Sequence, residues 1–83
     1  MKIQNQTRHQ NELLILLKEL REAKAIRQIE IAEKLGVPQS FISKYESGVR
    51  RLDILELRRI CQIIGISLQD FVKKLEERLN ESK

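Results

Sequence analysis

The stretch Gln28–Gly48 constrains the fold most strongly, because it holds two short helical patterns separated by a glycine and a proline. In the first pattern apolar residues recur at helical spacing, and Gly36 can adopt the left-handed backbone that ends a helix. Pro38 suits a helix entry, so the second helix is predicted to run from about Pro38 to Ser47. Helices this short are not stable alone, so the pattern predicts helix, tight turn, helix within a larger core.

The second of these helices separates its side chains into an apolar face and a slim polar face. Phe41, Ile42 and Tyr45 share one side at the 3.6-residue period. The other side carries short or forked hydrogen-bonding groups with one full charge: Gln39, Ser40, Ser43, Lys44 and Ser47. Serine is a weak helix former and is not expected on an ordinary solvated face. Such a face fits the DNA major groove, where Gln pairs with adenine, Lys with guanine and Ser with either.

Taken together, these positions resemble the helix-turn-helix of the phage Cro and repressor type, also called the xenobiotic-response-element (XRE) family. The resemblance rests on Gln28 at the start of the first motif helix, Ala32 where the helices cross and Gly36 at the turn. Apolar residues occupy the positions that the family directs into the core: Ile31, Leu35, Val37, Ile42 and Tyr45. It extends over about residues 13–71 and implies an all-α, compact five-helix lambda-repressor-like DNA-binding domain.

The resemblance also implies roles for individual residues. Base readout is expected from the polar face of the second motif helix: Gln39, Ser40, Ser43 and Lys44. Phosphate contacts are expected from the entry of the motif, its last residue and the following loop: Gln28, Arg27, Ser47, Arg50 and Arg51. Similar proteins pair an Arg near the end of their first helix with a Glu near the end of the recognition helix. Here these residues are Arg21 and Glu46, and the alternative is two separately solvated charges.

Two positions depart from the family's pattern. Members often carry Gly, an apolar residue and then a capping Ser or Thr before the Gln, whereas this chain has Ala25, Ile26 and Arg27. Pro38 stands where a Ser or Thr often caps the recognition helix, and such a cap contributes about 1 kcal/mol. We expect these changes to lower local stability and to leave the fold intact.

The N-terminal segment is expected to divide into an arm and a helix. Residues 1–10 are polar and lack an apolar period, so we interpret them as a flexible arm in which Lys2 and Arg8 could reach DNA. A single domain is expected over residues 11–83, and its first helix would begin after an Asn11 cap. That helix would cover the motif with an apolar face formed by Leu13, Leu16, Leu17 and Leu20.

Two further helices are predicted after the motif. One would run from Asp53 to about residue 64 and end at a left-handed Gly65. Its inward residues are expected to be Ile54, Leu57, Ile60, Cys61 and Ile64. The last helix, about residues 67–80, would begin with a Ser67 cap and close the core with Leu68, Phe71 and Val72.

The last helix also predicts a dimer. A heptad-like seam gives the candidate dimerisation residues Phe71, Val72, Leu75 and Leu79. Leu75 and Leu79 would be exposed in a monomer, so we expect a homodimer whose recognition helices read half-sites roughly 34 Å apart. The alternative is a helix that folds back on its own domain.

Composition narrows the function classes. The 83 residues suit one domain, and 16 basic against 12 acidic residues give a net charge of +4, which leans toward polyanions. One Cys excludes an internal disulfide, and one Cys with one His are too few for a metal site, so no metal and no cofactor are expected. No apolar run is long enough for a membrane span, which favours a cytoplasmic protein. No nucleophile lies near a recognisable base, so an enzyme is not expected.

The sequence therefore predicts a sequence-specific DNA-binding transcription regulator, in the first place a repressor. Its partner would be double-stranded DNA with an inverted-repeat operator, bound by a homodimer through the major groove. The alternative from another class is an antitoxin-like protein-interaction module in which DNA binding is secondary and the last helix serves a protein partner.

Overall fold

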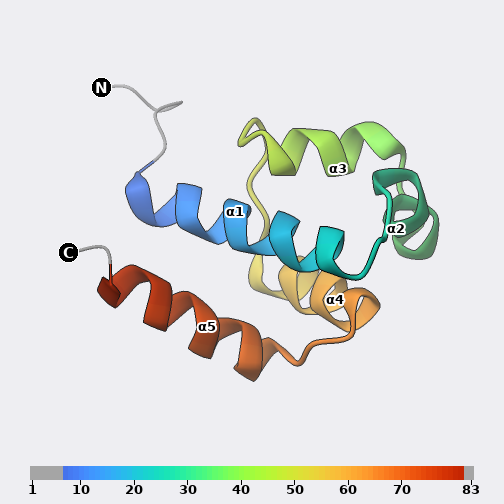
Figure 1. Ribbon diagram of the computed structural model, residues 1–83. Coiled ribbons are helices and arrows are strands. Elements are labelled where there is room, and N and C mark those ends of the chain that lie inside the picture. The colour runs from blue at the N-terminus through green and yellow to red at the C-terminus, as the bar shows by residue number, and fades with distance from the viewer. Residues whose placement is uncertain (1–6, 82–83) are drawn as a thin grey trace.

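The computed structural model describes residues 7–81, which form five α-helices and no strand (Figure 1). The helices are α1 Arg8–Ala23, α2 Gln28–Leu35, α3 Gln39–Glu46, α4 Ile54–Ile64 and α5 Leu68–Glu81. The helix-turn-helix is α2 with α3, which pack on each other. Helix α1 packs on α3 and α5, and α4 packs on α2 and α5. The prediction of an all-α, five-helix domain is confirmed, and none of these helices is long and apolar enough to cross a membrane.

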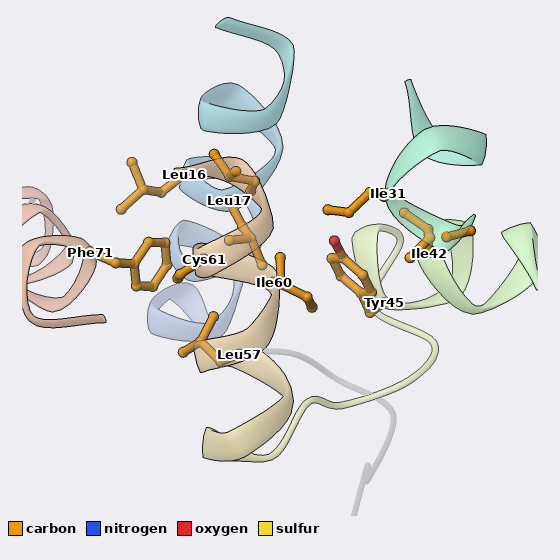
Figure 2. Packing of buried hydrophobic residues seen from close by; sticks show 11 residues of the cluster. Leu16, Leu17, Ile31, Ile42, Tyr45, Leu57, Ile60, Cys61 and Phe71 are labelled. Carbon is orange, nitrogen blue, oxygen red and sulfur yellow. The ribbon is translucent and has the colours of Figure 1, made fainter. Parts of the chain in front are cut away.

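The core lies around α4. Figure 2 shows Ile31, Ile42 and Tyr45 of the motif on one side of this helix and Leu16 with Phe71 on the other. Cys61 is fully buried between these groups, and burial raises the pKa of its thiol to about 11. The thiol is therefore protonated and behaves as a small hydrophobe, as expected from the sequence. One continuous core thus joins the motif to the three supporting helices.

Four of the helices end at a left-handed residue. Gly36, Gly48 and Gly65 lie just past α2, α3 and α4, with φ of 76°, 88° and 101°. After α1 the left-handed residue is Ala25, with φ of 57°. Its N–H donates to the carbonyl of Glu22 at 2.9 Å, so the chain completes the same kind of helix end without a glycine. An L-residue in this conformation costs about 1–2 kcal/mol, because its Cβ crowds the following carbonyl.

Helix α1 begins earlier than expected. Its cap is Thr7, whose hydroxyl accepts a hydrogen bond from the N–H of Gln10 at 3.1 Å. The prediction of an Asn11 cap is wrong, and residues 8–10 belong to the helix and not to the expected arm. The polar composition of this turn hid a helical start that a Thr side chain stabilises. Lys2, the other candidate arm contact, lies outside the described residues.

Two residues expected to point inward are exposed. Ile54 is the first residue of α4, so it precedes the part of the helix that meets the core, and 58% of it is exposed. Val72 follows the buried Phe71, and one residue along a helix turns the side chain by about 100°. It therefore faces solvent.

Candidate nucleic-acid interface

The polar face of α3 is exposed as the sequence predicts. All five of its polar side chains face solvent: Gln39, Ser40, Ser43, Lys44 and Ser47. The apolar side of the same helix anchors it, because Ile42 and Tyr45 are fully buried. Pro38 stands at the N-cap without a side-chain hydrogen bond, so tertiary packing holds the first turn in place of a cap.

Two serines of this face are internally hydrogen-bonded. The hydroxyl of Ser43 donates to the carbonyl of Ser40, and the hydroxyl of Ser47 donates to the carbonyl of Lys44, both at 3.2 Å. Because each hydroxyl proton is used within the helix, the oxygen lone pairs remain as acceptors. The serines therefore keep the face slim and present oxygen atoms to an incoming donor.

The last turn of α3 is held by a buried ion pair with α1. Nε of Arg21 donates to Oε2 of Glu46 at 2.7 Å, and Nη2 donates to Oε1 at 3.1 Å. Only 7% and 6% of the two side chains are exposed, and Nη1 of Arg21 donates to the carbonyl of Ile26 at 2.6 Å. The hydrogen bonds to Glu46 raise the pKa of Arg21, against the opposing effect of burial. The structure thus brings together the two residues that the sequence assigned as a pair.

Glu46 also orients the first residue of the recognition helix through Gln28. The amide nitrogen of Gln28 donates to Oε1 of Glu46 at 2.9 Å, and its oxygen accepts from Nε2 of Gln39 at 3.2 Å. Since a carboxylate only accepts, the nitrogen of Gln28 must face Glu46 and its oxygen must face Gln39. The side-chain amide of Gln39 is therefore held in one orientation before any ligand binds. The sequence analysis assigned the Gln28 amide to a phosphate, but in the structure its nitrogen and its oxygen both form hydrogen bonds within the protein.

Glu30, at the third position of α2, stabilises the entry of this helix. Its Oε1 accepts the backbone N–H of Arg27 at 2.8 Å, and its Oε2 lies 3.4 Å from Nη2 of the same residue. The backbone hydrogen bond, with the side-chain contact after it, lowers the pKa of Glu30. Glu30 binds the N–H of the N-cap residue itself, so the oxygen that a Ser or Thr would offer to the first turn is not replaced. The guanidinium of Arg27 stays exposed beside the start of the motif.

The two arginines after α3 lie in different surroundings. Nη1 and Nη2 of Arg50 donate to the two oxygens of Glu56 at 3.1 and 2.9 Å, and Nη1 also donates to the carbonyl of Arg51 at 2.8 Å. The side chain of Arg51 is exposed and forms no ion pair with any residue between 7 and 81. Sequence analysis treated the pair as equivalent phosphate contacts. The structure separates them into one engaged and one solvated side chain.

A signal for this difference was present in the sequence and was missed. Asp53 and Glu56 have the spacing of a capping box, in which Asp53 accepts the N–H of Glu56 at 2.8 Å and Glu56 accepts the N–H of Asp53 at 2.9 Å. The sequence analysis took Asp53 only as the start of this helix and overlooked Glu56, whose fixed carboxylate contacts Arg50.

The residues expected at a dimer interface differ in their exposure in the structure. Phe71 is fully buried beside Leu16 and Cys61 (Figure 2), so its assignment to a dimer contact is wrong. Leu75 and Leu79 are half-buried, and Leu75 packs against the core because α5 folds back along α1.

Arg78 strengthens the packing of α5 on α1. It forms ion pairs with Glu19 at 2.7 Å and with Glu12 at 3.7 Å. Within one chain, α5 therefore adopts the arrangement that the sequence analysis kept as its alternative.

The two-helix motif buries its apolar side and presents the polar face of α3 to solvent. A hydrogen-bond network behind α3 orients this face. These features define a helix-turn-helix domain of the kind that reads DNA. The helix-turn-helix family model matches residues 17–71. This chain belongs to that family, within its Cro/C1 or XRE type, whose members are DNA-binding transcription regulators.

Solved structures agree with this assignment. An XRE-family like protein from Pseudomonas syringae pv. tomato str. DC3000 is 44% identical with a TM-score of 0.80, over 84% of this chain and 85% of that chain. The restriction-modification controller protein C.Esp1396I, solved as a tetramer with its natural 35 base-pair operator, is 24% identical with a TM-score of 0.78, over 87% and 95%.

More distant likeness extends to another regulator. The clp gene regulator ClgR from Corynebacterium glutamicum is 20% identical with a TM-score of 0.79, over 94% of this chain and 83% of that chain. The structures below 25% identity show the shared fold alone. No curated protein matches the chain in sequence.

Proposed function

We propose that this protein is a transcription regulator that inserts α3 into the major groove of an inverted-repeat operator and represses the adjacent promoter as a homodimer. The observation that carries the proposal is the exposed face of α3, with Gln39 oriented by Gln28 and Glu46. A Gln held in one amide orientation can offer an acceptor and a donor together, which is what adenine requires in the major groove.

The remaining residues of the face fit the same role. Ser40 and Ser43 add short acceptors, and the exposed ammonium of Lys44 suits guanine. Arg27, Ser47 and Arg51 are exposed at the two ends of the motif and are proposed to contact phosphates. Phosphate contacts would set the register of the domain, and the α3 face would supply the sequence preference.

Dimerisation follows from the geometry of an inverted repeat. Two domains related by a two-fold axis place their recognition helices in successive major grooves roughly 34 Å apart. The exposed Val72 and the half-buried Leu75 and Leu79 are proposed to contribute to the contact between copies. The tetramer of C.Esp1396I on its operator supports assembly on DNA for a related fold.

The test is selection of bound duplexes from a random library, read together with the mass of the protein–DNA complex. We expect enrichment of a palindrome whose half-sites lie about 10–10.5 base pairs apart, bound by two copies. Gln39→Ala should then cost about 1–3 kcal/mol on that site and relax one base position, with little effect on unrelated DNA. If no sequence is enriched at moderate salt, α3 is not a reader by itself, and a protein-interaction role takes its place.

A further inference from the structure

We propose that Arg50 is a positioning residue for the recognition helix and not a phosphate contact. With Phe41 and Glu56 it forms a clamp, the Phe41–Arg50–Glu56 clamp, which fixes the first half of α3 against the first turn of α4. The inference rests on the proposed function of α3 as the DNA reader. It assigns to Arg50 a role in specificity, exerted through Phe41, in place of a role in general affinity.

The hydrogen bonds of Arg50 argue for this role. Three of its five N–H groups are used within the protein, two by Glu56 and one by the carbonyl of Arg51. Two parallel bonds to one carboxylate fix the plane of the guanidinium as well as its position. A phosphate would have to compete with this carboxylate for the same donors.

The flat surface of the guanidinium is also occupied. Its central carbon lies 4.2 Å from the centre of the Phe41 ring, within the range of a cation–π contact. Phe41 in turn meets Tyr45 edge to face, with ring centres 6.1 Å apart and planes inclined by 76°. The clamp therefore continues through Phe41 to the buried Tyr45 of the same helix.

Glu56 is itself held in place, so the clamp has a fixed base. Its Oε1 accepts the backbone N–H of Asp53 at 2.9 Å within the capping box of α4. The carboxylate cannot follow Arg50 toward DNA without breaking that cap. Arg50 is thus tied to α4, while Phe41 lies directly between Ser40 and the buried Ile42 in the chain.

The position of Phe41 explains why specificity should respond. The reading residues Gln39 and Ser40 immediately precede Phe41, and Gln39 is already tied to α2 through Gln28. The clamp ties the same half of α3 to α4 on another side. Loss of either connection would let the first turn move, and direct readout depends on placing side chains against base edges.

The first test measures binding to the selected operator and to an unrelated duplex over a range of salt, with Arg50→Gln, Arg50→Lys, Glu56→Gln and Arg51→Gln. Arg50→Gln removes the cation–π contact and the exposed ion pair, so it should lower the ratio of operator to unrelated binding by about fivefold. Glu56→Gln removes the ion pair and keeps Arg50 over Phe41, so it should lower the ratio by less. Arg50→Lys keeps the charge and loses the fork and the stacking, so it should not rescue the ratio. The double variant Arg50→Gln/Glu56→Gln should lose no more than Arg50→Gln alone.

Arg51→Gln is the matched control, because it removes the neighbouring charge without touching the clamp. It should weaken both duplexes alike and lower the salt slope by about 0.9. Glu56→Gln also removes a negative charge, so its effect is read together with the salt slope of Arg50→Gln and the result for Arg50→Lys. Tighter binding to both duplexes by Glu56→Gln, together with a reduced salt slope for Arg50→Gln and rescue by Lys, would identify Arg50 as a phosphate contact and overturn the proposal.

A second measurement tests the clamp without DNA, so that it stays separate from the proposed function. Amide resonances of residues 39–42 should shift in the same pattern in Arg50→Gln and Glu56→Gln, and should keep their wild-type positions in Arg51→Gln. If no variant binds DNA while this pattern is present, the clamp stands and the reader fails. If these resonances do not shift in Arg50→Gln or in Glu56→Gln, the clamp does not position α3.

Discussion

Two arginine–glutamate pairs lie beside the recognition helix, and they differ in their exposure to solvent. Arg21 and Glu46 are 7% and 6% exposed, whereas Arg50 and Glu56 are 39% and 31% exposed. Both pairs are bidentate, with shortest distances of 2.7 and 2.9 Å. Arg21 binds its carboxylate through Nε and Nη2, and Arg50 binds its carboxylate through Nη1 and Nη2, so two bidentate pairs lie in different dielectric surroundings.

The difference teaches what each pair contributes. In the exposed pair, solvent screens the attraction and would stabilise either charge alone, so the pair mainly fixes geometry. In the buried pair, each charge has given up its water, so removal of one partner leaves the other unsatisfied. The buried pair, Arg21 with Glu46, should therefore govern stability, and the exposed pair, Arg50 with Glu56, should govern the placement of α3.

The largest effect should come from breaking the buried pair. Glu46→Gln should lower the free energy of unfolding by about 3–5 kcal/mol, because it leaves the buried Arg21 charge with only the largely exposed carboxylate of Glu22, 4.0 Å away. Urea denaturation measures this loss. The double variant Arg21→Met/Glu46→Leu should recover part of it, since it removes both charges and keeps the volume but leaves the Ile26 carbonyl and the Gln28 amide without these partners. A loss below about 1 kcal/mol for Glu46→Gln would mean that this pair contributes no more than a solvent-exposed ion pair and would contradict the prediction.

The next effect concerns Tyr45, which shares the dry surroundings of the buried pair. Its hydroxyl is buried and has no hydrogen-bond partner among the described residues, and burial raises its pKa above the usual value. Tyr45→Phe should therefore raise the free energy of unfolding by about 1 kcal/mol, because it removes an unsatisfied polar group. Thermal and urea unfolding of this variant give the sign. A loss of comparable size would mean that the hydroxyl is satisfied in solution.

A smaller gain in stability should come from a substitution in the turn after α1, whose backbone accepts a hydrogen bond from Arg21. Ala25 is left-handed, and the carbonyl of the next residue, Ile26, accepts from Arg21. Ala25→Gly should stabilise the protein by about 0.5–1 kcal/mol, since relief of Cβ strain exceeds the added entropy of the unfolded chain. The matched control is Ala23→Gly at the last helical residue of α1, which should destabilise by a similar amount. If both glycine variants change the free energy of unfolding in the same direction, Ala25 is not strained.

The smallest effect should come from the exposed pair. Hydrogen bonds from Arg50, and then from the Asp53 backbone, lower the pKa of Glu56 below its ordinary 4.5. A lowered folded-state pKa gives stability that is present above pH 4.5 and is lost as pH falls through the folded value. Glu56→Gln should cost at most about 1 kcal/mol at neutral pH and should flatten this acid loss. Arg50→Gln should flatten the acid loss only in part, because the N–H of Asp53 still binds Glu56. An unchanged acid limb in both variants would show that the pair does not persist in solution.

The sequence predicted the motif well because its signals are local. Gly36 and Gly65 mark helix ends through backbone conformation, and the polar face of α3 follows from its period alone. The pairing of Arg21 with Glu46 came from the family's pattern and spans 25 positions. Periodicity by itself could not have supplied it.

What the sequence did not predict depends on loops and on tertiary contacts. The capping-box spacing of Asp53 and Glu56 marks a fixed carboxylate, but the path of the chain between α3 and α4 brings Arg50 to it, and that path cannot be derived from spacing. Whether the α5 leucines meet another copy or the same chain depends on the direction of α5 after its turn, and α5 returns along α1. Periodicity gives the apolar face of a helix and does not give that direction. Ala25 was seen as a missing glycine, but only the backbone shows that it keeps the left-handed conformation.

The packing of α5 along α1 has a consequence for protein engineering. The ion pair of Arg78 with Glu12 brings the last turns of one helix beside the first turns of the other, so the described chain nearly closes on itself (Figure 1). A short linker could join these ends, and new termini could be opened in the surface turn between α4 and α5. Such a circular permutant would test whether the order of the helices matters once their contacts are kept.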